Sequence, residues 1–255
     1  MVKLSNSATP SLNSDTEIDA QEQAWPAAIF DPLRNFSRDK MFVIGQIGQT
    51  IDGRIATVTG QSKYINGPSG LLHLHRLRAV VDAVVVGIGT VLADDPQLTV
   101  RLATGAHPAR VVIDPNHRLA FSPKIFNDDG VRRIVITKVG AECPAPKGVE
   151  ILYLPTENGN ISPEAILKSL AEIGLRRILI EGGADTVSRF MQAGCLDRLH
   201  VIVAPIIMGS GRPGFCLPAI EHMDQAQRLI VHAHKLEDEL LIDCDLSACV
   251  QRKKD

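Results

Sequence analysis

Residues 177–186 read RILIEGGADT, and this stretch decides the fold. Its apolar centre, ILI, is typical of a buried strand in a parallel sheet. Two glycines follow, and glycine allows the backbone to turn sharply and to be approached closely by a ligand. Residues 83–92, AVVVGIGTVL, repeat the order of apolar strand, glycine turn and helix start. The chain therefore contains two strand–turn–helix units of the kind that build α/β proteins.

The same alternation of strands and helices continues on both sides of these units. The two units predict strands at 83–87 and 177–181. The other predicted strands are 41–48, 51–57, 110–114, 133–137, 151–154, 199–204, 229–234 and 240–246, and the predicted helices are 67–81, 89–95, 162–174 and 184–193. The last two strands are separated by Glu237-Asp238 and predict a hairpin. We expect an α/β fold with a mixed, mostly parallel central sheet, helices on both faces and a C-terminal antiparallel hairpin.

The composition changes along the chain and indicates three parts. Residues 1–24 are rich in Ser, Asn, Asp and Thr, and we expect a disordered tail there. Residues 25–39 contain Trp25, Ile29 and Phe30 and are predicted to form an N-terminal arm. The folded domain is expected at 40–250. No apolar stretch follows a basic start, so we expect no signal peptide.

Bulk properties argue against several classes of function. The net charge is −2 and the pI is about 6.4, which gives no support to a nucleic-acid or membrane partner. None of the five cysteines forms a C-x-x-C pair, so neither a zinc site nor a disulfide framework is indicated. We expect reduced thiols in a cytoplasmic protein and no metal centre.

The two glycine turns are candidate sites for an anionic ligand. Both are expected at the carboxyl ends of parallel strands, where α/β sheets bind ligands. The amides and the dipole of a helix N-terminus favour a group such as a pyrophosphate. The first turn begins like G-x-G-x-x-G, but the sixth position is Leu92, so the dinucleotide fingerprint is incomplete. The alternative is a pair of tight turns without a ligand.

Polar residues near the turns leave two interpretations open. Asp94 follows the first turn and is available for function, whereas Asp95 precedes proline and suits a turn. Arg101 is equally suited to cap a carbonyl group or to bind a phosphate. Glu181 ends an apolar strand and is either solvated there or an acceptor for a ligand hydroxyl or amide.

Ordered motifs resemble the reductase domain of the bifunctional deaminase-reductase of riboflavin biosynthesis. They are TIDGRIA (50–56), GQSKYI (60–65), LRA (77–79), DA (82–83), GIGTVL (87–92), DDPQLTVR (94–101), IEGG (180–183), AP (204–205) and GSG (209–211). The resemblance covers nearly everything from Lys40 to Leu246. It implies a dihydrofolate-reductase-like fold, a homodimer, and hydride transfer from NADPH to 5-amino-6-(5-phosphoribosylamino)uracil, which yields the ribitylamino product.

The resemblance also implies site residues. The cofactor contacts are expected at Gly48, Tyr64, Thr90, Asp94, Gly183, Ala184, Asp185 and Thr186. The substrate contacts are expected at Ser62, Arg78, Leu98, Arg101 and Glu181. Because a nicotinamide carries the hydride, the protein has to align the reactants and supply a proton. Asp94 is the candidate proton donor, and water is its competitor.

Two departures from this family pattern keep alternatives open. The zinc signature of the deaminase half, H-x-E with a later P-C-x-x-C, is absent from the sequence, which indicates a stand-alone reductase. Tyr64 stands where tryptophan is common, and tyrosine can still stack on a flat ring. The alternatives are a same-fold NADPH reductase of another pyrimidine or pterin-like compound and a non-catalytic nucleotide-binding relative.

Overall fold

A computed structural model describes residues 29–37, 39–119, 123–142 and 145–247. The tail predicted at 1–24 and the start of the predicted arm lie outside the described residues. The strands are β1 (Phe42–Thr50), β2 (Arg54–Thr57), β3 (Ala83–Gly87), β4 (Ala109–Ile113), β5 (Arg133–Lys138), β6 (Val149–Leu154), β7 (Arg177–Glu181), β8 (Arg198–Ala204), β9 (Gly211–Pro213), β10 (Ile230–Leu236) and β11 (Glu239–Asp245). The α-helices are α2 (Asp31–Arg34), α3 (Pro68–Val80), α4 (Ile88–Asp94), α5 (Pro163–Glu172) and α6 (Ala184–Gln192).

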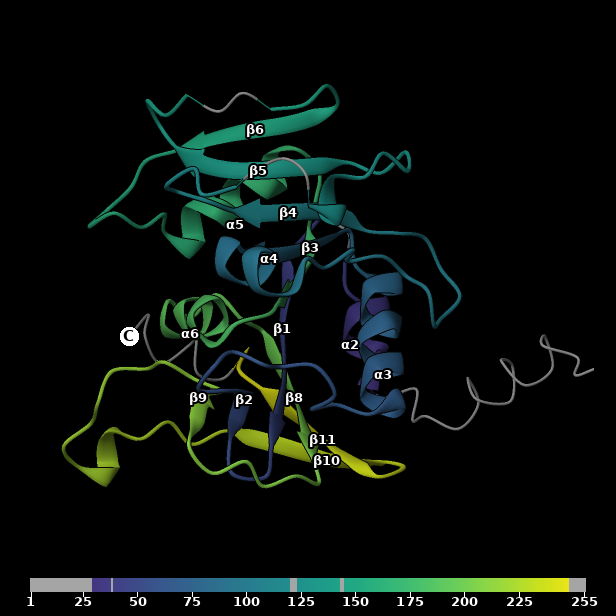
Figure 1. Ribbon diagram of the computed structural model, residues 1–255, viewed down its shortest axis with the longest axis vertical. Coiled ribbons are helices and arrows are strands. Elements are labelled where there is room, and N and C mark those ends of the chain that lie inside the picture. The colour runs from purple at the N-terminus through teal and green to yellow at the C-terminus, as the bar shows by residue number, and fades with distance from the viewer. Residues whose placement is uncertain (1–28, 38, 120–122, 143–144, 248–255) are drawn as a thin grey trace, which may run out of the picture.

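A nine-stranded sheet forms the centre of the molecule, in the order β10-β11-β8-β1-β7-β3-β4-β5-β6 (Figure 1). The strands from β8 to β6 in this order pair in parallel, and β11 pairs antiparallel with β8. β10 and β11 form the C-terminal antiparallel hairpin at the edge. The predicted fold class is therefore confirmed, and β7 and β3, which carry the two glycine turns, are direct neighbours.

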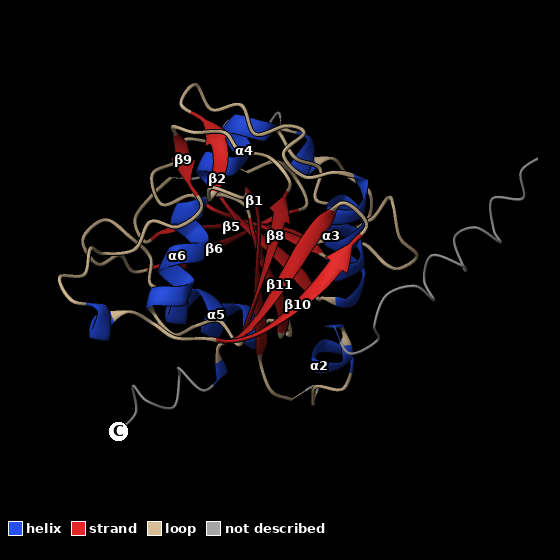
Figure 2. Cartoon of the chain, turned by 90° about the horizontal axis from the view of Figure 1, so that it is seen from below, coloured by secondary structure: helices blue, strands red, loops and turns tan. Residues whose placement is uncertain are grey.

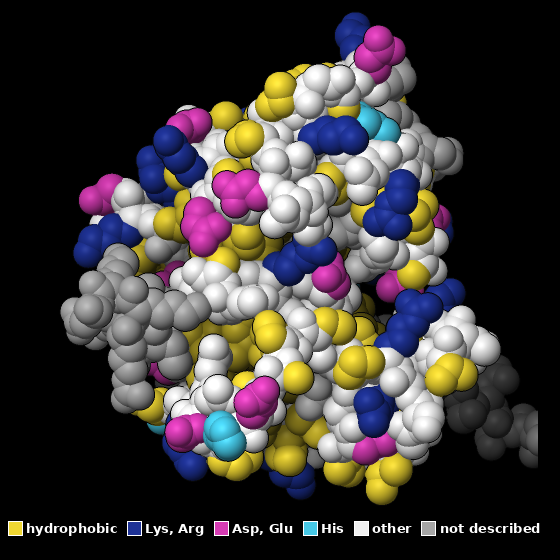
Figure 3. Space-filling view, turned by 90° about the vertical axis from the view of Figure 1, so that its left-hand side faces the viewer, with side chains coloured by type: hydrophobic (Ala, Val, Ile, Leu, Met, Phe, Trp, Pro, Cys, Tyr) yellow, Lys and Arg dark blue, Asp and Glu magenta, His cyan; other side chains and the backbone are white. Residues whose placement is uncertain are grey.

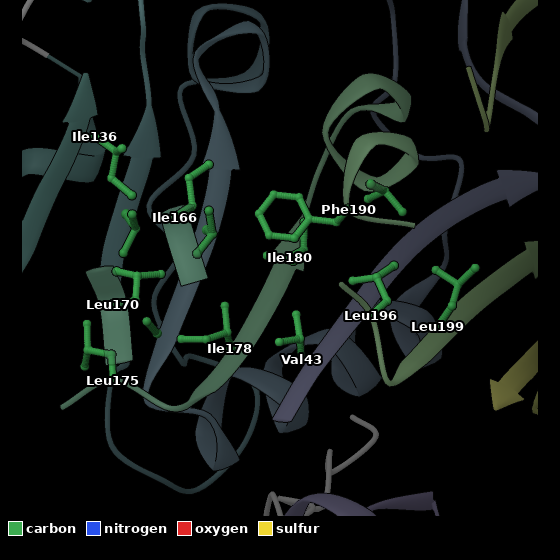
Figure 4. Close-up of a cluster of buried hydrophobic side chains, with 14 of the residues drawn as sticks. Val43, Ile136, Ile166, Leu170, Leu175, Ile178, Ile180, Phe190, Leu196 and Leu199 are labelled. Atoms are coloured by element: carbon green, nitrogen blue, oxygen red, sulfur yellow. The ribbon is translucent and has the colours of Figure 1, made fainter. Parts of the chain in front are cut away.

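Side chains alternate along each central strand and so build a core on both faces of the sheet. Val43 of β1 and Ile178 and Ile180 of β7 face α5 and α6, where they pack with Leu170 and Phe190 (Figure 4). The intervening residues belong to a second cluster with α2, α3 and α4, which includes Ile44, Leu77, Val84, Val91 and Leu179. The helices accordingly cover the two faces of the sheet (Figure 2).

One predicted strand needs correction, and one short strand of the structure was not predicted. Residues 51–57 do not form one strand, because Gly53 adopts a φ of 73° in a turn and only Arg54–Thr57 is extended. This β2 pairs antiparallel with β9 in a separate two-stranded sheet. β9 was not predicted, since its three residues, Gly-Arg-Pro, include two types that are rare in strands.

Local signals place the helices where the sequence predicts them. Ser162 accepts the amide of Ala165 at 3.1 Å, and Pro163 opens α5. In the described part of the predicted arm, Ile29, Phe30 and Leu33 are buried in the second cluster, which ties the arm to the face that carries α3. Within the described residues, no helix has the length and apolar character needed to cross a bilayer.

Candidate active-site cleft

A cleft of about 910 Å³ opens where the parallel strands end. Its lining comes from the ends of β1, β3, β4 and β7, the first turns of α4 and α6, and the loop before α3. Figure 3 views the molecule from the side to which β4, β5 and β6 point in Figure 1, and shows charged side chains of both signs around hydrophobic surface. The cleft thus lies at the carboxyl ends of the parallel strands, where the glycine turns were expected to bind a ligand.

The two glycine turns interlock on the floor of this cleft. The Gly183 amide donates to Thr90 Oγ1 at 3.0 Å, so the second turn is bonded to the first. Gly182 has a φ of 97°, and a Cβ there would lie 2.6 Å from Thr90 Oγ1. A Cβ at Gly87 would lie 2.5 Å from Thr186 Oγ1. Each turn therefore packs a threonine against a glycine of the other.

The same floor leaves room for a phosphate group above Gly183. A Cβ added at Gly183 would meet only Thr90 Oγ1 within 4 Å, at 3.6 Å, and a Cβ at Gly89 would meet nothing. Gly183 precedes α6, whose first turn contributes a positive dipole end and the amides of Ala184 and Asp185, which have no partner among the described residues. Bare backbone at the start of a helix, facing open space, fits the pyrophosphate of a dinucleotide.

Arg78 and Glu181, both expected to contact substrate, are bonded to each other. Arg78 Nε and Nη2 each donate to a carboxylate oxygen of Glu181 at 2.7 Å, and Nη1 donates to the Thr99 carbonyl at 3.1 Å. The two residues are only 6% and 4% exposed and both line the cleft. Two of the five N–H groups of the Arg78 guanidinium remain for a ligand. The ion pair with Glu181 holds these two donors in a fixed position at the wall of the cleft.

Asp94 and Ser62 close the cleft from the side of α4. Ser62 Oγ donates to Asp94 Oδ1 at 2.9 Å, which joins the loop before α3 to the end of α4. Leu98, buried and with a φ of 54°, lies in the segment that follows. Of the residues proposed from the sequence, the cleft brings together Gly48, Ser62, Arg78, Thr90, Asp94, Leu98, Glu181, Gly183, Ala184, Asp185 and Thr186.

Tyr64 and Arg101 are not part of this lining. Tyr64 is 92% exposed, with a φ of 70°. Arg101 is exposed, and its Nη1 donates to Gln97 Oε1 at 2.9 Å and to Thr99 Oγ1 at 2.6 Å. A contact between either side chain and a ligand in the cleft would need a rotation of that side chain or a movement of its loop.

His75 of α3 anchors the segment that carries Arg101. Its Nδ1 accepts the Arg101 amide at 2.8 Å, so the proton of the neutral ring is on Nε2. Burial, together with the nearby charges of Arg78 and Arg101, lowers the pKa of His75 to about 4. The neutral ring is thus the form that the folded protein holds.

This histidine is expected to make the fold sensitive to acid. Because the folded-state pKa of His75 lies below the ordinary value of 6.5, the unfolded chain takes up the proton first, and stability falls as pH drops from 6.5 to 4. At pH 5 the loss from this group should be about 2 kcal/mol. Urea unfolding at pH 7 and pH 5 measures it. The glutamine in His75→Gln can also accept the Arg101 amide but does not titrate, so the decrease in the free energy of unfolding between pH 7 and pH 5 should be smaller than in the wild type by this amount. The same decrease in both proteins would contradict the lowered pKa of His75.

The cleft also contains polar residues that the sequence did not single out, namely Gln46, Asn66, Asn116, Arg118, Asn160, Arg189 and Arg212. Asn116 and Arg118 lie in the loop after β4, so the rule that ligands bind at the carboxyl ends of parallel strands could have found them. Asp114 holds this loop, because its oxygens accept the amides of Arg118 and Leu119 at 3.1 and 2.9 Å. No comparable signal marks the others.

Comparison with known proteins identifies relatives of most of the described chain. The model of the RibD C-terminal domain matches residues 41–236. The riboflavin biosynthesis protein RibD of Aquifex aeolicus is 38% identical to this chain over a match that covers 69% of this chain and 49% of that protein. This chain therefore spans about half the length of that relative. A 2,5-diamino-6-ribosylamino-4(3H)-pyrimidinone 5′-phosphate reductase of Methanothermobacter thermautotrophicus is 34% identical, with 79% of this chain and 96% of that protein covered.

A solved structure gives the same result for the fold. The deaminase/5-amino-6-(5-phosphoribosylamino)uracil reductase of Thermotoga maritima superposes with a TM-score of 0.69 at 29% identity, covering 86% of this chain and 59% of that one. The match to the family model runs from the start of β1 to the end of β10. This chain therefore belongs to the family of the RibD C-terminal domain.

Proposed function

We propose that this chain is an NADPH-dependent reductase that converts the ribosyl group of 5-amino-6-(5-phosphoribosylamino)uracil to the ribityl group in riboflavin biosynthesis. The observation that carries the proposal is the pair of interlocked glycine turns, open at Gly183, beside the Arg78–Glu181 pair in one cleft. The reductase family implies a nicotinamide cofactor, which supplies the hydride when bound.

Different residues of the cleft are proposed to bind the cofactor, to bind the substrate and to supply the proton. The segment from Gly183 to Thr186, which includes the first residues of α6, is proposed to bind the pyrophosphate, and the amides of Ala184 and Asp185 are available to donate to it. Two N–H groups of Arg78 remain for the substrate, and Glu181 keeps the guanidinium fixed. Asp94, bonded to Ser62, is the residue proposed to hold the proton for the opened sugar. Arg101, on the segment held by His75, is proposed for the substrate phosphate.

A second substrate has support from one relative. The Methanothermobacter thermautotrophicus protein, covered over 96% of its length, is named as a reductase of the diaminopyrimidinone phosphate rather than of the uracil. The two compounds differ at one ring position, where one carries an amino group and the other an oxygen. Oxidation of NADPH, followed by its absorbance with each compound in turn, tests the proposal. If the protein binds NADPH but oxidises it with neither compound, the chain is a nucleotide-binding protein and not the proposed reductase.

Arg118 supports NADPH over NADH. It lies in the cleft on the β4 side, and in the described part of the chain no acidic side chain forms an ion pair with it. Arg118→Ala is expected to weaken NADPH binding about tenfold and to leave NADH binding unchanged, because a charge-assisted hydrogen bond to the 2′-phosphate is lost. Binding titrations of both coenzymes measure the ratio of the NADH dissociation constant to the NADPH dissociation constant.

Arg189→Ala is the control for this substitution, because Arg189 already pairs with Asp185, and it should leave this ratio unchanged. Equal losses of affinity for both coenzymes in Arg118→Ala would refute the proposed role of Arg118.

The proposal includes a homodimer. β10 is an edge strand of the sheet, so one row of its backbone groups has no partner strand within the described residues. Ile230, Val231 and Leu240 of the hairpin are each about half exposed. We propose that a second copy of the chain covers this open, apolar edge.

A further inference from the structure

Glu239, at the start of β11, is a buried carboxylate that the proposed reaction does not use. It is 3% exposed and lies under the N-terminus of α3. Its Oε2 accepts the Gly70 amide at 2.7 Å, and its Oε1 accepts Asn66 Nδ2 at 2.8 Å. A Cβ at Gly70 would lie 2.7 Å from Oε2, so glycine at this position allows the close approach. A negative charge at the positive end of a helix of 13 residues is favourable.

This carboxylate determines which way the Asn66 amide points. Both Glu239 oxygens accept hydrogen bonds from N–H groups, so the Asn66 side chain must present its NH₂ group to Glu239. The Asn66 carbonyl oxygen then points the other way, toward β1. There it occupies the volume that a side chain at Gly48 would fill, since a Cβ at position 48 would overlap Asn66 Oδ1.

Asn66 Oδ1 is therefore a hydrogen-bond acceptor offered to the cleft. Asn66 and Gly48 both line the cleft, and among the described residues no N–H or O–H donor is bonded to Oδ1. A ligand group that meets this oxygen must be a donor, because a second acceptor would leave both oxygens unpaired. The orientation is fixed before the ligand arrives, so the site selects for a hydrogen-bond donor, either N–H or O–H.

The order of the strands indicates which ligand reaches this oxygen. The glycine turns lie between β7 and β3, with β1 beyond β7 and β4 beyond β3. A dinucleotide whose pyrophosphate sits on the turns extends one half toward β1 and the other toward β4. Arg118, beyond β4, suits the 2′-phosphate of the adenosine half. The nicotinamide half then extends toward Gly48 and Asn66.

We infer that Asn66 Oδ1 accepts a hydrogen bond from the carboxamide nitrogen of the nicotinamide, and that Glu239 is a positioning residue that holds Asn66 in the accepting orientation. The inference rests on the proposed function. It adds a specificity-determining residue, Asn66, and a buried residue, Glu239, that acts through it. The bond would fix the rotation of the nicotinamide ring and so the face from which the hydride leaves.

A cofactor analogue that lacks the donor tests this assignment by binding. In the 3-acetylpyridine analogue of NADPH, a methyl group replaces the carboxamide NH₂ and the carbonyl is kept. The wild-type protein should bind NADPH about tenfold more tightly than the analogue, because the analogue leaves Asn66 Oδ1 unpaired. In Asn66→Ala the two affinities should become nearly equal. Fluorescence titration of the complete chain gives the four dissociation constants without turnover.

The positioning role of Glu239 has its own variant and control. Glu239→Gln keeps an acceptor for the Gly70 amide but adds an NH₂ group, so Asn66 can turn over and the preference for NADPH should shrink. Asn116→Ala, at the β4 side of the cleft, should change both affinities by the same factor. Thermal unfolding of each variant checks that it is folded.

The outcomes separate this inference from the proposed function. An unchanged preference for NADPH in Asn66→Ala would overturn the assignment of Oδ1, and an unchanged preference in Glu239→Gln would overturn the positioning role. If Asn66→Ala instead weakens only the pyrimidine substrate, measured with NADP⁺ present, the acceptor serves the substrate and the cofactor assignment is wrong. Failure of the wild-type protein to bind NADPH would contradict the proposed function itself.

Discussion

Gly183→Val is expected to weaken NADPH binding by at least about 100-fold, which corresponds to about 3 kcal/mol. The valine side chain would extend into the open space above Gly183, where the pyrophosphate is proposed to approach the backbone. Gly183→Ala should give a smaller loss, since only one carbon is added. Titration of the coenzyme into each variant measures the effect.

Stability provides the control for this substitution. Gly183 has a φ of −54°, and its added Cβ would meet only Thr90 Oγ1, at 3.6 Å, so the thermal midpoint of Gly183→Val should stay close to that of the wild type. Gly182→Ala should lower the midpoint, because Gly182 has a φ of 97° and its Cβ would lie 2.6 Å from Thr90 Oγ1. Normal NADPH affinity in Gly183→Val would show that the turn is only a structural bend.

Glu181→Ala is expected to destabilise the fold by about 3–5 kcal/mol, because it leaves the buried Arg78 guanidinium without its partner. The double variant Arg78→Met, Glu181→Leu should recover most of this stability, since a buried ion pair is often replaceable by apolar side chains of similar volume. Urea unfolding of the single and double variants measures the free energies.

Activity separates the two roles of this pair. The double variant should be folded but should have lost turnover of the phosphorylated substrate, because it lacks the two guanidinium N–H groups that are proposed to bind the substrate. A double variant that is both stable and active would mean that Arg78 and Glu181 only support the wall of the cleft. A destabilisation of less than about 1 kcal/mol in Glu181→Ala would mean that solvent screens the pair.

Much of the fold could be predicted because strong local signals mark its central strands. β3 and β7 have the predicted bounds, Ala83–Gly87 and Arg177–Glu181, since each is a short apolar run that ends at a glycine turn. The strand predicted at 51–57 was wrong because Asp52 and Gly53 form a turn, in which Gly53 has a φ of 73° and its amide donates to the Thr50 carbonyl at 3.0 Å. The Asp52 carboxylate also accepts the amides of Met208 and Gly209, and this contact with a loop more than 150 residues away follows only from the folded arrangement.

The candidate site was predictable to a similar degree. The glycine turns and Asp94 could be found from their places after strands. The pairing of Arg78 with Glu181 spans 103 residues and that of Asn66 with Glu239 spans 173, so both follow only from the folded arrangement. Charge alone could not rank Arg101 and Arg118, because only the structure places Arg118 in the cleft and Arg101 outside it. Local sequence identifies turns, and tertiary contacts decide which side chains meet there.

The backbone of the turn at Gly182 and Gly183 is proposed to bind a nicotinamide dinucleotide. Amide NMR of the ¹⁵N-labelled protein during titration with NADPH tests it most directly, because the Gly183 amide now donates to Thr90 Oγ1 and would exchange that partner for a phosphate oxygen. Large, saturable shifts are expected for the amides of Gly183, Ala184 and Asp185. Saturable NADPH binding that leaves these three amides unshifted would contradict it.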